Sequence, residues 1–158
     1  MHATIEKFVE CASERFDFQV DVHELQEGTK TAKDAADAVG ADLEQIVKSM
    51  VMNVDGDLIV CLTSGSNEVA SAQLAEKFGV SEESVTTADP EVVKNELGWS
   101  IGGVPPFCHD SDVPVLMDET LANQDTVWAG GGTPDALFPI DPERLEEYSS
   151  AERADVYS

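Results

Sequence analysis

The sequence is short of basic residues. Nine of its 158 residues are Lys or Arg and 32 are Asp or Glu, which gives a formal net charge of −23. The acidic residues recur from Glu6 through Asp155, and a hydrophobic content of 42% is too high for a disordered polyanion.

In dilute salt such a domain would repel nucleic acid. Two interpretations remain: a cationic or non-nucleic-acid partner, or a cytoplasm of molar salt, where the Debye length is about 3 Å. We favour a cytoplasm of molar salt. Because salt would screen the negative charge of the protein, this interpretation allows an RNA ligand.

Cysteines are few and long apolar runs are missing. Cys11, Cys61 and Cys108 show no CxxC spacing, so the sequence predicts neither a disulfide framework nor a zinc site, and a reducing compartment is expected. No apolar run approaches the ~18 residues of a membrane span, and the N-terminus is charged where a signal peptide would be apolar. We therefore expect a cytoplasmic protein with no membrane partner.

Familiar catalytic motifs are also missing. The sequence contains no GxSxG, HExxH or GxxxxGK[ST] motif and no run of ligand-type residues at metal-binding spacing. Cys108 and His109 are adjacent, but neighbouring side chains diverge, so Cys108 is interpreted as structural. We expect no metal and no cofactor. Any enzyme built from this chain would rely on backbone dipoles, on positioning and on groups of its substrate.

The apolar spacing predicts a single α+β domain over residues 1–148, followed by a frayed tail over 149–158. Strands and helices do not alternate regularly, which favours a mixed, barrel-like sheet with flanking helices. Helices are predicted at Ala3–Phe16, Thr31–Val39, Val69–Phe78, Glu91–Leu97 and Asp141–Tyr148. Strands are predicted at Asp17–Glu24, Ile46–Val54, Leu58–Thr63, Trp99–Ile101, Val113–Met117, Thr126–Ala129 and Leu137–Ile140.

Lys48 stands out within a predicted strand. Residues two apart share a face, so Lys48 lies on the more apolar face, with Ile46 and Met50. One interpretation is a lysine whose stem covers apolar surface while its amine reaches water. The other is a cation at the mouth of a pocket that binds an anion such as phosphate, or an ester carbonyl.

Two glycine-rich loops are the other candidates. The first, Ile101–Phe107, pairs two glycines with two prolines, so that backbone amides can approach a ligand while the exit of the loop is stiff. The second, Ala129–Pro134, contains three consecutive glycines between two predicted strands. Each is also consistent with an ordinary tight turn.

Three segments together resemble the YbaK/prolyl-tRNA-synthetase-associated editing domain family: Ile46–Met52, Ile101–Phe107 and Trp128–Ile140. Val115–Glu119 and Asp141–Leu145 match the family in order and spacing, so the resemblance covers roughly residues 5–145. It implies an α+β fold with a barrel-like sheet. It also implies metal-free hydrolysis of the ester that joins a wrong amino acid to the terminal adenosine of a tRNA.

The resemblance also implies roles for individual residues. Lys48 corresponds to a lysine that holds the acylated end of the tRNA, and Gly102 and Pro106 fit a GxxxP loop whose amides orient the ester. The residues assigned to catalysis are Lys48, Gly102, Gly103, Val104 and Pro106. Those assigned to substrate binding are Ser64, Gly65, Phe107, Gly130, Gly131 and Gly132.

The expected partner is the acceptor end of a mischarged tRNA, with a synthetase as a second candidate and no DNA. Pro105 and Cys108 replace the small hydroxyl residue and the glycine that are common in the family, so the amino acid removed stays open among Ala, Cys, Ser, Thr and others.

We expect a deacylase acting in trans, on a small amino acid attached to tRNA-Pro. The alternatives are a non-catalytic module that binds an aminoacyl-adenosine or docks a synthetase, and an acidic domain with a vestigial pocket. Lys30 and Lys33 are expected to assist Lys48.

Overall fold

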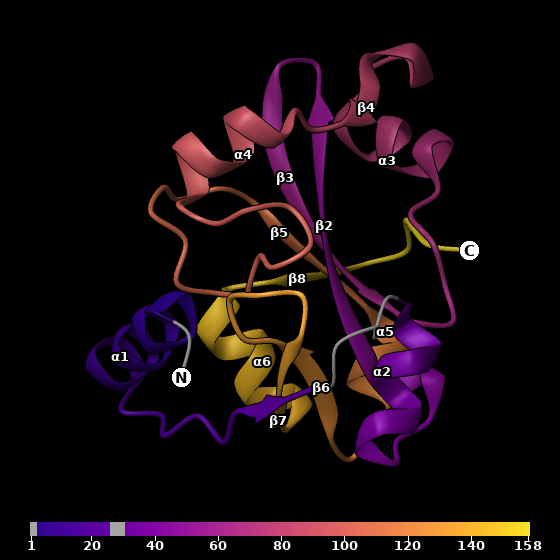
Figure 1. Ribbon diagram of the computed structural model, residues 1–158. Coiled ribbons are helices and arrows are strands. Elements are labelled where there is room, and N and C mark those ends of the chain that lie inside the picture. Colours follow the sequence, from indigo (N-terminus) through magenta and orange to yellow (C-terminus); the bar gives the residue numbers. More distant parts are fainter. Residues whose placement is uncertain (1–2, 26–30) are drawn as a thin grey trace.

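The computed structural model describes residues 3–25 and 31–158, and Figure 1 shows its arrangement. Within these ranges no helix has the length and apolar character needed to cross a membrane. Lys30 lies outside the described residues. The helices are α1 (Ala3–Phe16), α2 (Ala32–Val39), α3 (Ser71–Phe78), α4 (Pro90–Leu97), α5 (Glu119–Ala122) and α6 (Pro142–Ser149), with short 3₁₀ turns η1 (Leu43–Gln45) and η2 (Glu82–Ser84).

The described strands form one mixed sheet. Its order is β1-β7-β6-β2-β3-β5-β8, and β4 pairs with β2 outside this path. The pairs β2–β6, β3–β5 and β5–β8 are parallel and the others antiparallel, which confirms the predicted α+β fold with a mixed sheet. The strands are β1 (His23–Glu24), β2 (Ile46–Val54), β3 (Asp57–Ser64), β4 (Val85–Thr87), β5 (Val115–Asp118), β6 (Val127–Gly130), β7 (Ala136–Ile140) and β8 (Glu152–Ala154).

The β2–β3 hairpin is the centre of the sheet. The two strands pair along their length from Val47↔Ser64 to Val54↔Asp57. The predicted Asp55-Gly56 turn joins them, with positive φ at both residues, as a tight hairpin requires. In Figure 1, α3, α4 and β4 lie near the turn of this hairpin, and α2 and α5 lie near its open end.

The other edge of β2 is paired only at its two ends. Ile46 and Val47 pair with β6, and Met52–Val54 pair with β4. The middle of β2 therefore borders an opening between β6 and β4 instead of a neighbouring strand.

The main core packs α1 and α6 against the sheet. Phe8 is fully buried and contacts the rings of Trp99, Phe107 and Phe138 at centroid distances of 6.2, 5.4 and 5.1 Å. These contacts join the first helix to the segment 99–107, and so help to fix the position of one of the glycine-rich loops.

The prediction of a frayed tail is wrong. Glu152–Ala154 form β8, parallel to β5, and Val156 and Tyr157 are 2% and 8% exposed. The C-terminal segment is held because β5 would otherwise be an unpaired buried edge. Burial raises the pKa of the Tyr157 phenol, which is consistent with a neutral core residue.

One predicted strand is much shorter than expected and another is absent from the described structure. Only His23–Glu24 of the segment 17–24 is a strand, and Trp99–Ile101 belongs to a turn. The Trp99 indole N–H donates to the Cys108 carbonyl at 2.9 Å, so burial of this ring, rather than strand pairing, explains the apolar pattern there.

Candidate functional site

A cavity of about 530 Å³ lies at the opening beside β2, and we call it the Lys48 cavity. It is bounded by β2, by α2 with its capping residue, by the loop after Ser100 and by the glycine-rich turn after β6. The lining residues are Thr31, Ala32, Ala35, Ile46–Val51, Thr87, Ile101, Gly102, Val104, Gly130, Thr133, Pro134 and Leu137.

Among the described residues, none of those that line the Lys48 cavity is Asp or Glu, although the chain has 32 of them. Lys48 is the one charged residue in that described lining. Other cations of the protein pair with carboxylates: Lys77 with Glu152, Arg144 with Asp141 and Arg153 with Glu146. In the described part of the chain no carboxylate pairs with Lys48, so its field extends into the cavity, which favours an anionic ligand.

A hydrogen-bonded chain holds Lys48 in place. Its Nζ donates to the Asn67 carbonyl at 2.8 Å. The Asn67 side-chain amide donates to Asp118 Oδ2 at 2.9 Å and to Thr120 Oγ1 at 3.1 Å. Asp118 is 3% exposed and also accepts from the Ser64 backbone N–H at 3.1 Å, so its buried charge is compensated by donors. This positioning group was missed in the sequence. An Asn in the loop after β3 and an Asp at the end of β5 carry no local signal of their contact.

The two glycine-rich loops pack against each other, backbone on backbone. A Cβ at Gly103 would lie 2.7 Å from the Gly132 carbonyl oxygen, and one at Gly132 would lie 3.0 Å from the Thr4 carbonyl oxygen. Gly102 and Gly132 also have positive φ, of 89° and 106°. Gly103 requires glycine because a side chain there would push the loops apart, and Gly102 and Gly132 favour glycine because of their positive φ. We call this contact the glycine wall.

The far end of the first loop is braced from three sides. Cys108, with φ 68°, forms a disulfide with Cys11 of α1, which corrects the expectation of unpaired cysteines. The two cysteines are 97 residues apart, so their spacing gave no signal. His109 Nε2 hydrogen-bonds the Pro105 carbonyl at 2.8 Å. Burial lowers the pKa of His109, partly opposed by that hydrogen bond, so the ring is neutral and donates to the carbonyl.

The cysteines supply no nucleophile. Cys11 and Cys108 are joined to each other, and burial raises the pKa of the Cys61 thiol to about 12. A thiol this weakly acidic remains protonated and unreactive at neutral pH. Within the described residues no cluster of three or more His, Cys, Asp or Glu is arranged to hold a metal ion.

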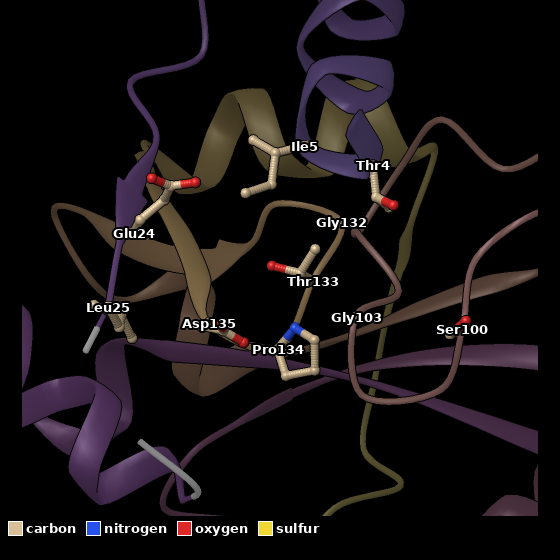
Figure 2. A pocket seen from close by; sticks show the side chains of 10 residues that line it. All are labelled: Thr4, Ile5, Glu24, Leu25, Ser100, Gly103, Gly132, Thr133, Pro134 and Asp135. Atoms are coloured by element: carbon tan, nitrogen blue, oxygen red, sulfur yellow. The ribbon is translucent and has the colours of Figure 1, made fainter. Parts of the chain in front are cut away.

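A second cavity of about 510 Å³ lies beside the glycine wall and is shown in Figure 2. We call it the Glu24 cavity. It shares Thr133 and Pro134 with the Lys48 cavity, but its described lining contains two carboxylates and no Lys or Arg. Its lining residues are Thr4, Ile5, Glu24, Leu25, Ser100, Gly103, Gly132, Thr133, Pro134 and Asp135.

The structure brings only some of the predicted site residues to the Lys48 cavity. Lys48, Gly102, Val104 and Gly130 line it, whereas Gly103 and Gly132 line the Glu24 cavity. The Gly103 N–H donates to the Ser100 carbonyl at 3.0 Å, so this amide is already used within the turn. Lys33 is exposed on the first turn of α2 and does not line the cavity.

The remaining predicted residues lie behind the cavity. Ser64 is fully buried and donates to the Glu44 carbonyl, and a Cβ at Gly65 would meet the backbone of Leu43. Phe107 is 2% exposed in the aromatic core. Pro106 and Gly131 are also buried, and none of these five residues lines either cavity. They support the site instead of forming its surface.

The fold and the cavity together define an α+β domain with a lysine-bearing pocket at an opening beside the central strand β2 of a mixed sheet. The chain belongs to the aminoacyl-tRNA editing domain family, whose model matches residues 26–148.

Known relatives agree with this assignment. A solved structure described as a candidate trans-editing enzyme for prolyl tRNA synthetase superposes with a TM-score of 0.92 at 35% identity, covering 100% of this chain and 99% of that one. The uncharacterised protein YwhH of Bacillus subtilis (strain 168) is 28% identical over 82% of this chain and 81% of its own length. The proline–tRNA ligase of Staphylococcus haemolyticus is 30% identical over 64% of this chain, but this chain spans only 17% of that enzyme.

Proposed function

We propose that this protein is a trans-acting aminoacyl-tRNA deacylase that hydrolyses the ester of a mischarged tRNA. The amino acid is small, such as Ala or Cys, and the tRNA is tRNA-Pro. The proposal rests on family membership, on the relative described as a candidate editing enzyme for prolyl tRNA synthetase, and above all on the Lys48 cavity. In a protein of net charge −23, a cavity whose described lining holds a lysine and no carboxylate suits a polyanionic ligand.

Lys48 and the apolar residues of the cavity bind different parts of the substrate. Lys48 binds the terminal phosphate or ribose of the tRNA and thereby fixes the ester against the β2 side of the cavity. Buried apolar residues around it, including Val51, Val104 and Leu137, receive the amino acid side chain. Water attacks the ester carbonyl, the acyl–oxygen bond breaks, and the ribose oxygen takes up a proton. A hydroxyl group of the substrate's own ribose assists the water. No metal takes part in this scheme.

Small amino acids fit the dimensions of the site. The cavity must hold the terminal adenosine and the amino acid together within about 530 Å³, and the buried residues Val47 and Val51 are part of its lining. A bulky side chain would clash with these buried residues. Proline, the correct amino acid on tRNA-Pro, carries a secondary ammonium group within a rigid ring. This difference from Ala or Cys would allow the site to leave Pro-tRNA-Pro intact.

A deacylation panel tests the proposal. tRNA-Pro charged with Ala, Cys, Ser, Thr or Pro is incubated with the protein in molar KCl with EDTA, and ester loss is followed by acid-gel or thin-layer analysis. We expect accelerated loss of Ala or Cys, unchanged Pro-tRNA and no effect of EDTA. Ester loss at the uncatalysed rate for every substrate would leave the non-catalytic binding module, for which a stable aminoacyl-adenosine analogue would still bind.

A further inference from the structure

The backbone of Ser49 is unpaired in the middle of the sheet. The Ala88 N–H donates to the Val51 carbonyl at 3.1 Å, so Val51 directs its backbone groups to the outer edge of β2. Ile46 directs its carbonyl to the other edge, where the Gly65 N–H donates to it at 2.8 Å. Backbone groups alternate in direction along a strand, so Ser49 presents both its N–H and its C=O to the outer edge.

No described group meets these two atoms. The β2–β6 pairing ends at Val47 and Ala129, and the Gly131 N–H turns away to bond the Ala136 carbonyl at 2.9 Å. On the other side the β4 segment reaches only to Val51, through Ala88. Ser49 is half-buried and lines the Lys48 cavity, so its unpaired N–H and C=O are sheltered polar groups with a place for a ligand.

The opening is one residue long. In an antiparallel sheet, two residues of a hydrogen-bonded pair exchange both of their N–H···O bonds with each other. A single amino acid offers the same two groups, an amine that donates and a carbonyl that accepts. A peptide strand of several residues would run into β6 at one end and Ala88 at the other.

We propose that the Ser49 backbone holds the amino acid of the substrate as a one-residue antiparallel strand. The α-ammonium donates to the Ser49 carbonyl, and the ester carbonyl accepts from the Ser49 N–H. This inference rests on the proposed deacylase function and assigns a binding residue within it. The Ser49 N–H also stabilises the negative charge that develops on the carbonyl oxygen as water adds.

The pairing fixes where the amino acid side chain lies. Directly paired residues of an antiparallel sheet share a face, so the substrate's side chain lies on the face of Ser49, flanked by Val47 and Val51. Both valines are buried, at 5% and 4% exposure, which limits the size of that side chain. Lys48 lies on the opposite face and is free to hold the nucleotide.

Substitution of Ser49 tests the role of its backbone. Ser49→Pro removes the N–H, and the fold should tolerate it because that N–H faces the opening and not the β3 ladder. Ser49→Ala keeps the backbone and removes only the hydroxyl. We expect Ser49→Pro to lower the single-turnover deacylation rate about 10- to 100-fold, the loss of one charge-assisted contact. Ser49→Ala, which keeps both backbone groups, should lower the rate far less than Ser49→Pro does, and circular dichroism should show both variants folded.

A substrate without the amine tests the carbonyl of Ser49 independently of any mutation. Propionyl-tRNA-Pro has the size of alanyl-tRNA-Pro but lacks the ammonium, and its ester is also intrinsically less reactive. Measured against the uncatalysed hydrolysis of each ester, we expect the wild type to accelerate loss of the propionyl group about 10- to 100-fold less. Equal accelerations of the two esters, an undiminished rate in Ser49→Pro, or equal losses in Ser49→Pro and Ser49→Ala would each overturn the inference while leaving the deacylase intact. A wild type inactive on every ester would instead contradict the proposed function.

Discussion

The Lys48 cavity and the Glu24 cavity have nearly the same volume, about 530 and 510 Å³, and share Thr133 and Pro134. Their charges are opposite. Among the described residues, the lining of the first contains a lysine and no carboxylate, and the lining of the second contains Glu24 and Asp135 and no cation. In a protein with 32 acidic residues, the exclusion of carboxylates is the more informative property. It indicates that charge, more than volume, locates the site of an anionic ligand on this fold.

The largest effect is expected at the glycine wall that separates the two cavities. Gly103→Ala would place a Cβ 2.7 Å from the Gly132 carbonyl oxygen, so the loops must separate. We expect a loss of about 1–3 kcal/mol in the free energy of unfolding and a collapse of deacylase activity. Gly130→Ala is the matched control, since its nearest neighbour would be 3.8 Å away. Urea unfolding measures both, and equal stability of the two variants would show that the wall does not depend on glycine.

The support beneath Lys48 comes next. Asp118→Ala leaves the Ser64 N–H and the Asn67 amide without their acceptor, which should cost about 1–3 kcal/mol in the free energy of unfolding. Because the Asn67 carbonyl holds Lys48, activity should fall even at temperatures where the variant stays folded. Asp118→Asn keeps one acceptor oxygen and should recover part of both losses. Full activity in Asp118→Ala would exclude this positioning role.

The positive charge of the Lys48 cavity can be offset by a substitution at one residue. Thr87 lines the Lys48 cavity, whereas its exposed neighbour Thr86 does not. Thr87→Glu should raise KM for aminoacyl-tRNA by a factor of about 5 to 10, corresponding to roughly 1 kcal/mol of like-charge repulsion. Thr86→Glu adds the same charge and should change KM little. The effect should shrink as KCl increases, and identical KM values for the two variants would count against an electrostatic origin of the site.

A smaller effect is expected from His109, which braces the first loop. Burial lowers its folded-state pKa below the ordinary value of about 6.5, so the unfolded chain takes up a proton first as the pH falls. This contribution to stability is complete above pH ~6.5 and is lost below it. His109→Gln keeps a donor for the Pro105 carbonyl but does not titrate. The difference in unfolding free energy between wild type and variant should therefore change between pH 7.5 and 5.5, and a constant difference would contradict the assignment.

Local patterns predicted much of the fold. The β2–β3 hairpin and its Asp55-Gly56 turn were predicted from alternation and turn chemistry, and the structure confirms them. Lys48 was singled out because it interrupts an apolar strand face, and it does line a cavity. These features depend on residues close together in the sequence, where periodicity is informative.

Long-range contacts were not predictable from the sequence. Asn67 and Asp118 are 51 residues apart, Cys11 and Cys108 are 97 apart, and nothing in either segment marks its partner. Strand β8 has only three residues, too short for a periodic signal, and it forms because β5 offers it an edge. The unpaired backbone of Ser49 is likewise a property of where β6 and β4 end, not of the residues in β2.

The central claim is that the Lys48 cavity hydrolyses the ester of an aminoacyl-tRNA. The most direct test is single-turnover deacylation of Ala-tRNA-Pro in molar KCl by wild type, Lys48→Ala and Lys33→Ala, the last being an exposed lysine outside the cavity. The account predicts rapid deacylation by wild type and Lys33→Ala, and a rate lowered at least about 100-fold in Lys48→Ala, as expected when a positioning contact is removed. Equal rates for Lys48→Ala and wild type would contradict it.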